Sequence, residues 1–280
     1  MIIGYVKNVD SIIRAAIAIK ANPGATAVCG KDSKDLKQKL SQYHGEAVVN
    51  IDDVVKNVPF HIKASLWVKT PTCGRAQRPV SLGMYLNYAL RHNKCVPDDL
   101  VKLLSYYYPN LTLILSHKDT VAKRYYHMYR EAMGELERMK AHTRFRPAGD
   151  MLYVEIYPEH DVQDLYMEWA ARRNDDRASV IKCHTLYYLI NACRLGYPKE
   201  IAGISKEEAE RLLGNIPACD NAIWDTFYDS QSIENRRNKK YAKKMLPAKY
   251  SYISPEVRKE RKKIERGIPL NSLDDFSDKA

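Results

Sequence analysis

The spacing of apolar residues between positions 118 and 173 constrains the fold more than any other part of the chain. Residues 118–143 carry an apolar stripe at helical spacing, so we expect one long helix there. Residues 151–157 alternate with a period of two, which indicates a strand with Tyr153, Glu155 and Tyr157 on one face. Proline follows this strand, and the next helix is predicted over Val162–Arg173.

The first 58 residues alternate strand and helix signals. The predicted strands are Ile2–Val6, Thr26–Cys29 and Ala47–Ile51, and the predicted helices are Ile12–Ala21 and Lys31–Gln42. We therefore expect residues 1–58 to form a small α/β unit. Residues 59–266 are expected to form a helix-rich domain with a basic C-terminal segment, and residues 267–280 a loose tail.

The middle of the chain adds further helices and a candidate hairpin. Predicted helices are Ser81–His92, Pro97–Tyr108 and Lys206–Leu213; Ser179–Cys183 and Leu186–Ile190 are two strands, and Leu111–Leu115 is a buried strand or the entry to the next helix. The fold class is therefore α+β, predominantly helical with a small sheet and a basic helical C-terminus.

Positive charge is concentrated near the C-terminus. Residues 234–266 hold thirteen Lys and Arg against four Glu, a net charge of +9, whereas the whole chain carries +11. Clustered cations bind polyphosphate because each neutralised phosphate releases condensed counterions. We expect a DNA-binding surface formed by Arg236, Arg237, Asn238, Lys239, Lys240, Lys243, Lys244 and Lys249. The alternative is a solvated helix face.

Aromatic residues are dominated by tyrosine, with 20 Tyr against 4 Phe. Tyrosine rings suit base stacking, and we expect Tyr153, Tyr157 and Trp224 to receive an extruded base. The alternative is that the rings line the core while their hydroxyls find partners.

Cysteine spacing argues against a metal centre. The six cysteines include no C-x-x-C pair, so we expect reduced thiols, no metal and no cofactor. We recognise no signal peptide, and the apolar run Ser11–Ile19 is too short to cross a bilayer. A cytoplasmic protein with no membrane partner is expected.

Three sequence blocks resemble one family. They are YREAMGELERMKAHTRF at Tyr129–Phe145, the segment Leu152–Val162, and the segment Ile223–Tyr250, which contains IWDTFY and LPAKY. In this order they are similar to an uncharacterised bacterial family assigned to DNA metabolism or DNA repair. Its members occur beside a radical-SAM protein, and some are fused to a uracil-DNA-glycosylase-like domain. The resemblance implies DNA metabolism but supplies no reaction, and Glu137 stands where the family usually has His.

The turn that follows the strand 151–157 contains the candidate catalytic pair, His160 and Asp161. Excision of a base needs a carboxylate that steadies the sugar cation and a donor for the departing base. The alternative is that Asp161 caps the following helix.

Arg144 and Arg146 flank Phe145 at the end of the long helix. We interpret them as DNA-binding residues, an arginine clamp on a phosphate or a flipped base. The alternative is that they neutralise the helix C-terminus.

The sequence therefore predicts a DNA-binding protein that acts on a nucleobase, a glycosylase-like hydrolase that excises a damaged or modified base. One alternative is a non-catalytic DNA-binding partner of a radical-SAM or glycosylase enzyme. A further alternative is an RNA-binding or RNA-modifying protein. Neither a P-loop nor a G-x-G-x-x-G motif is present, so nucleotide hydrolysis has no support.

Overall fold

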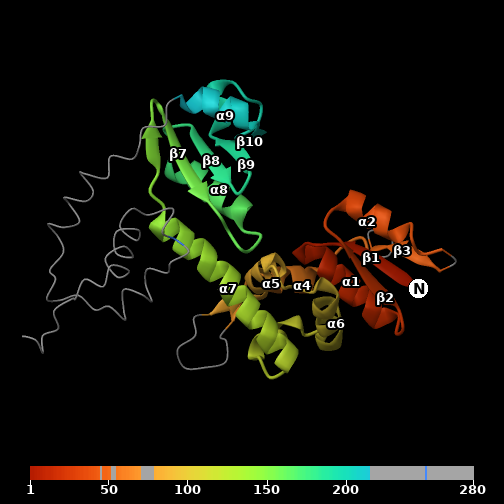
Figure 1. Cartoon of the computed structure of the whole chain (residues 1–280). Coiled ribbons are helices and arrows are strands. Elements are labelled where there is room, and N and C mark those ends of the chain that lie inside the picture. Colours follow the sequence, from red (N-terminus) through yellow and green to blue (C-terminus); the bar gives the residue numbers. More distant parts are fainter. Residues whose placement is uncertain (45, 52–54, 71–78, 215–249, 251–280) are drawn as a thin grey trace, which may run out of the picture. The chain divides into compact units, whose positions relative to one another are not determined.

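A computed structural model of the chain describes residues 1–44, 46–51, 55–70, 79–214 and 250. The predicted mixed α/β class is confirmed (Figure 1). The chain divides into two compact units, Met1–Glu135 and Leu136–Ala280, and each is described by itself. In the part of the chain that the structure describes, no helix is long and apolar enough to span a bilayer.

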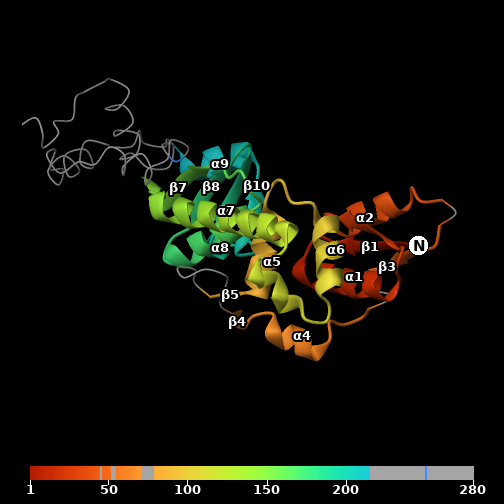
Figure 2. The same ribbon diagram turned by 90° about the horizontal axis from the view of Figure 1, so that it is seen from below.

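The first unit contains a three-stranded parallel sheet. Its strands are β1 (Ile2–Val6), β2 (Thr26–Gly30) and β3 (Val48–Asn50), in the order β2-β1-β3. Helices α1 (Val9–Ala21) and α2 (Ser33–Leu40) connect them, and β1 lies between these helices (Figures 1 and 2). Gly4 allows α2 to pack closely, because a Cβ atom there would lie 2.6 Å from Leu40 Cδ1.

Helices complete the core of the first unit. They are α4 (Phe60–Ser65), α5 (Leu82–Arg91), α6 (Pro97–Tyr107), the 3-10 helix η1 (Leu111–Ser116) and α7 (Thr120–His142), with a short ladder of β4 (Lys69–Thr70) and β5 (Val80–Ser81). One hydrophobic core runs from Ile3 to Tyr129. This core contains residues on both sides of position 58, where the sequence predicts the end of a small α/β unit.

The helix predictions in this unit hold with small shifts. Proline occupies the first turn of α6 as expected, and α1 begins at Val9 because Asn8 accepts a hydrogen bond from the Ser11 amide. A strand at Leu111–Leu115 is wrong, since this segment forms η1. Buried tyrosines follow the core alternative: the Tyr85 and Tyr125 hydroxyls donate to the carbonyls of Ala122 and Val96.

The second unit contains a five-stranded sheet in the order β10-β9-β8-β7-β6. Its strands are β6 (Arg146–Ala148), β7 (Met151–Ile156), β8 (Ser179–Cys183), β9 (Leu186–Ile190) and β10 (Ile201–Ile204). Only β7 and β8 run parallel among these described strands, and α8 (Gln163–Arg173) connects them. The β8–β9 hairpin was predicted from sequence, whereas β6 and β10 were not.

Two helices cover opposite faces of this sheet (Figure 2). Helix α9 (Lys206–Leu213) packs its Ala209 and Leu213 on the face that carries Tyr153 and Val180. Helix α8 contacts β8 and β9 from the other side. The period-two prediction for β7 is thereby confirmed, since alternate residues face different helices.

Buried polar bonds and one distant tyrosine fix the end of α7. Thr143 Oγ1 lies 2.6 Å from the Tyr166 hydroxyl, and both groups are buried. Tyr250 is 1% exposed; its ring stacks on His142, and its hydroxyl accepts a hydrogen bond from Arg138 Nε at 3.2 Å. The first and third sequence blocks of the family resemblance therefore meet in space.

Candidate nucleic-acid interface

The candidate site lies where β7 and β8 end. These strands are parallel, so their carboxyl ends share one edge of the sheet. Glu155 of β7 is paired in register with Lys182 of β8 on this edge. Both side chains are about a quarter exposed, because α9 covers the apolar part of the same face and leaves this end open.

Glu155 is the centre of a charged cluster. Its Oε2 accepts hydrogen bonds from the Tyr157 hydroxyl at 2.8 Å and from Lys182 Nζ at 3.2 Å. Its Oε1 lies 3.5 Å from a guanidinium nitrogen of Arg146. Three strands or strand ends therefore converge on one carboxylate.

The cluster is held in its charged form. Partial burial opposes ionisation of Glu155, but hydrogen bonds from Tyr157, Tyr153 and Lys182 outweigh it and lower the Glu155 pKa. Burial likewise opposes the charge of Lys182, yet its bond to Glu155 raises the Lys182 pKa. At neutral pH, Glu155 is a carboxylate and Lys182 is an ammonium. This arrangement suits electrostatic stabilisation rather than proton transfer.

The predicted stacking residues have different environments. The Tyr157 ring is 38% exposed and meets the His184 ring edge-on at a centroid distance of 5.7 Å. Tyr153 is only 4% exposed, lies in the core under α9, and has the Arg146 guanidinium 5.1 Å from its ring centroid. Tyr157 is therefore accessible to a base, while Tyr153 is a core residue that positions Arg146.

The turn after β7 carries the predicted catalytic pair. His160 is buried, and its carbonyl accepts a hydrogen bond from the Val162 amide. Asp161 is exposed and accepts a hydrogen bond from Gln163 Nε2 at 2.8 Å. The N-cap of α8 is Val162, so the alternative in which Asp161 caps this helix is wrong.

His184 at the end of β8 holds this turn in place. Its Nε2 lies 3.0 Å from the Pro158 carbonyl oxygen, and its backbone adopts a positive φ of 53°. A non-glycine residue in this conformation is uncommon and is held there by its surroundings. The predicted turn and the Glu155 cluster are thus parts of one sheet edge.

The two predicted arginines of the clamp point to different partners. Arg144 donates to the carbonyls of Ala141 and Thr143, as expected for a cation at a helix C-terminus. Arg146 lies over Tyr153 and pairs with Glu155. Phe145 stacks on Trp169 at a centroid distance of 6.4 Å. Arg146 therefore belongs to the sheet-edge cluster, and a DNA contact by Arg144 stays a prediction.

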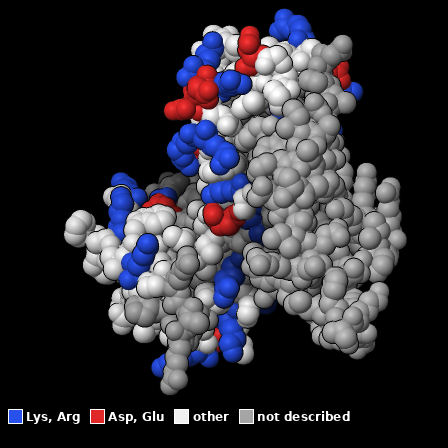
Figure 3. All heavy atoms as spheres, turned by 90° about the vertical axis from the view of Figure 1, so that its left-hand side faces the viewer, with Lys and Arg blue, Asp and Glu red and all other residues white. Residues whose placement is uncertain are grey.

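Other predicted site residues lie outside the described residues. These are Trp224, Arg236, Arg237, Asn238, Lys239, Lys240, Lys243, Lys244 and Lys249. Residues 136–214 with Tyr250 contain twelve Lys and Arg against thirteen Asp and Glu, so this part is nearly neutral. Figure 3 shows the two signs interleaved in the upper part of the view. This part of the chain therefore has no excess positive charge that would attract a polyanion over a distance.

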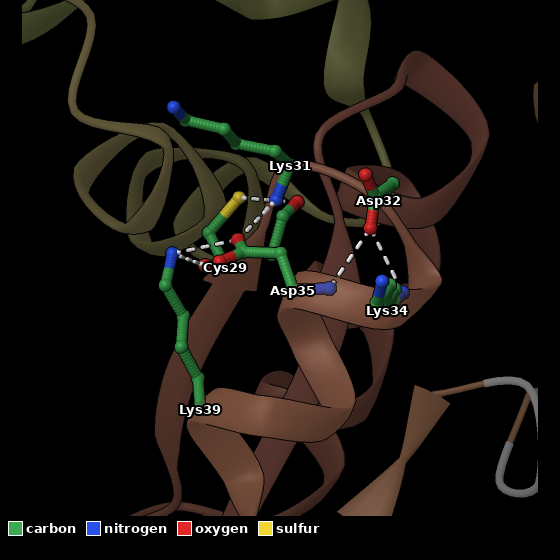
Figure 4. Close-up of polar contacts among 7 residues, drawn as sticks. Cys29, Lys31, Asp32, Lys34, Asp35 and Lys39 are labelled. Carbon is green, nitrogen blue, oxygen red and sulfur yellow. Dashed lines mark hydrogen bonds and ion pairs between the residues drawn. The ribbon is translucent and has the colours of Figure 1, made fainter.

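At the carboxyl end of β2 in the first unit, the backbone amides that could bind a phosphate already donate to aspartate side chains (Figure 4). Asp32 accepts hydrogen bonds from the amides of Lys34 and Asp35, each at 2.8 Å. The Asp35 carboxylate accepts from the Lys31 amide at 2.7 Å and pairs with Lys39 Nζ at 2.9 Å. These carboxylates occupy the positions that a phosphate takes at a helix N-terminus.

Sequence reasoning missed Glu155, Lys182 and His184 as site residues. Glu155 lies on the polar face of a predicted strand, and this position could have identified it as a candidate site residue. Its partner Lys182 became visible only through the register of two strands separated by a helix.

The chain belongs to the DUF4130 family, since the model of this domain of unknown function matches residues 98–256, more than half of the chain. The matched range includes α7, the five-stranded sheet and Tyr250, but not the parallel sheet of the first unit. No curated protein matches this chain. The family description names no activity, so DNA metabolism, the glycosylase fusion and the radical-SAM partner stay predictions.

Proposed function

We propose that this protein binds DNA at the carboxyl ends of β7 and β8 and works in DNA repair or modification as a glycosylase-like enzyme. The observation that supports this proposal most is the Glu155 carboxylate, which is kept ionised beside an exposed ring. Hydrolysis of a glycosidic bond passes through a sugar cation, and a fixed carboxylate stabilises that cation. Glu155 thus joins the predicted pair His160 and Asp161.

The surrounding side chains suit an extruded nucleotide. The exposed Tyr157 ring offers a stacking face, and the cations Lys182 and Arg146 beside it would contact the flanking phosphates. In the proposed step, water attacks the sugar carbon and loses a proton to solvent, the bond to the base breaks, and the base leaves with a proton donated by His160. Asp161, exposed in the adjacent turn, would orient that water.

The direct test incubates the full chain with duplexes that carry uracil, oxidised bases or hypermodified bases, followed by alkali. Strand breaks at the modified base are expected with the wild-type protein. Glu155→Gln should reduce them at least tenfold, because the neutral amide stabilises a sugar cation far less than a carboxylate does. Glu168→Gln is the matched control, since Glu168 is an exposed acid on α8 that pairs only loosely with Arg172. No break with any duplex at stoichiometric protein contradicts the catalytic part of the proposal.

A non-catalytic DNA-binding module is the second candidate. It is favoured by the pairing within the cluster, because Glu155 and Lys182 already satisfy each other's charge at 3.2 Å. It predicts salt-sensitive binding with no product and unchanged binding in Asp161→Asn. Competition between DNA and RNA of matched sequence tests the RNA-binding alternative.

The salt dependence of binding tests the predicted C-terminal cations. If about six phosphates are contacted, the slope of log affinity against log salt should be near −5. Replacing Arg236, Arg237, Lys239 and Lys240 with Ala should flatten that slope by about four units at most. An unchanged slope would place the phosphate contacts elsewhere.

A further inference from the structure

A cavity of about 420 Å³ lies within the first unit, between the turn that follows α5 and one side of α7. It is lined by His92, Lys94, Thr120, Lys123, Arg124, His127, Met128 and Glu131. The residues from α7 are spaced three and four apart, so they form a single face of that helix. A volume of this size is within the usual range of small-ligand sites.

Positive charge dominates the lining of this cavity. Lys94, Lys123 and Arg124 contribute three cations, and Glu131 contributes the one carboxylate. Among the described residues, neither Lys94 nor Lys123 forms an ion pair, whereas Arg124 pairs with Asp99 at 3.1 Å. The surrounding sequence reinforces this, because residues 1–135 hold nineteen Lys and Arg against eleven Asp and Glu, a net charge of +8.

The carboxylate in the lining is already engaged by a buried histidine. His92 is 4% exposed, and its Nε2 lies 2.8 Å from Glu131 Oε2. Its Nδ1 accepts a hydrogen bond from the Lys94 amide at 3.1 Å, so Nε2 carries the proton and donates to Glu131. This chain of bonds fixes the turn that bears Lys94 and gives the Glu131 carboxylate a hydrogen-bond donor of its own.

We propose that this cavity is a phosphate-binding pocket, held chiefly by Lys94 and Lys123, with Thr120 and His127 as further donors. The phosphate is that of a nucleic-acid backbone, an identity that rests on the proposed function. The second unit is nearly neutral over its described residues, so a cationic pocket in the first unit supplies attraction that the sheet edge lacks.

Inorganic phosphate is the first probe, because it tests the pocket without DNA. Titration of the full chain in low salt is followed by the side-chain carbon–proton NMR resonances of the histidines. The His127 resonance should shift and saturate, and the Lys94→Gln/Lys123→Gln double variant should weaken binding at least tenfold. Lys102→Gln, an exposed lysine of α6 that does not line the cavity, should bind as wild type does. A shift that does not saturate, or that is equal in the double variant, overturns the inference.

An oligonucleotide titration separates this inference from the proposed function. The double variant should flatten the salt slope of DNA binding by about one to two units. DNA binding with an unchanged slope and no phosphate saturation overturns the pocket while the proposed function stands. Phosphate saturation without any DNA binding supports the pocket, assigns it to a free phosphate compound, and removes the proposed function.

Discussion

Among the residues that the structure describes, the three-stranded and the five-stranded sheet each place parallel strand ends at one edge, but the polar groups at those ends are covered to different extents. In the first unit the polar groups form hydrogen bonds with one another. The Tyr5 hydroxyl donates to Asp98 at 2.6 Å, and Asp32 and Asp35 cap α2. In the second unit, Glu155 and Lys182 are paired yet remain partly exposed. The same local topology therefore serves as a scaffold in one unit and as an open edge in the other.

The difference follows from the helices that surround each edge. Helix α6 follows the first sheet in sequence and brings Asp98 of its first turn onto Tyr5. Helix α9 covers only the apolar part of its sheet face, so the charged end meets solvent. Coverage of the strand ends, rather than strand topology, decides which strand ends are accessible to solvent.

The largest expected loss of unfolding free energy comes from truncating a core side chain, and the loss should be similar in the two units. Ile13→Ala in the first unit and Ile181→Ala in the second remove fully buried side chains, and each should cost about 2–5 kcal/mol of unfolding free energy. Urea denaturation followed by circular dichroism measures this. The milder Ile→Val variants should cost about 0.5–1.5 kcal/mol. A cost below 1 kcal/mol for either alanine variant would show that its core is not packed as described.

The polar groups around Asn191, directly after β9, should contribute to the stability of the second unit, as the buried polar groups of the first sheet do. Asn191 Nδ2 donates to the carbonyls of Asn174 and Arg177 at 2.5 and 2.9 Å, and the residue has a φ of 56°. Asn191→Ala should cost about 1–3 kcal/mol, because these carbonyls lose their donor. Asn191→Gly removes the backbone strain but not the loss of bonds, so it should cost less. Equal stability of the alanine variant and the wild type in urea denaturation would contradict this contribution.

The first sheet should be sensitive to alkali. Burial, reinforced by Cys29 and Asp98, raises the Tyr5 pKa above its ordinary value near 10. The stability that the neutral Tyr5 contributes is therefore complete below pH 10 and is lost as the pH rises further. Tyr5→Phe should cost about 0.5–1.5 kcal/mol at pH 7 and weaken the alkaline loss. Tyr106→Phe, at a ring that is 73% exposed, should leave the pH profile unchanged in denaturation series from pH 8 to 12.

The smallest effect is expected at the open edge, in acid. The Glu155 pKa lies below its ordinary value near 4.5, so its contribution to stability is complete above that pH and is lost as the pH falls through the lowered value. Because the cluster is partly exposed and screened, the loss should not exceed about 1 kcal/mol. Denaturation series from pH 2 to 6 should show a shallower slope for Glu155→Gln than for wild type. A slope that the substitution leaves unchanged would remove Glu155 as the centre of the cluster.

Sequence patterns were sufficient where one segment contains the whole signal. The period-two alternation of β7, the long helix α7 and the span Lys206–Leu213 were all predicted from local spacing. Strand β10 was missed because its four residues include Gly203 and lack alternation. Strand β6 was missed because Pro147 is unfavourable within a strand and is tolerated here at the sheet edge.

The site was harder to predict than the fold. The Glu155–Lys182 pair depends on the register of two strands, and the cavity of the first unit depends on His92 meeting α7 from a distant turn. The sequence shows which segments are rich in Lys and Arg. The net charge of each compact unit, however, depends on where the folded chain divides. These relations are set by tertiary packing, which no local pattern contains.

Tyr250 determines how the C-terminal cations can be studied. The Tyr250 side chain is buried, and its hydroxyl accepts a hydrogen bond from Arg138. A truncation that ends before residue 250 therefore removes a buried core residue together with the charges. A shortened protein that loses DNA binding would then report damage to the fold as readily as loss of cations. Neutralising the lysines and arginines one by one, with this anchor kept intact, is the experiment that separates the two causes.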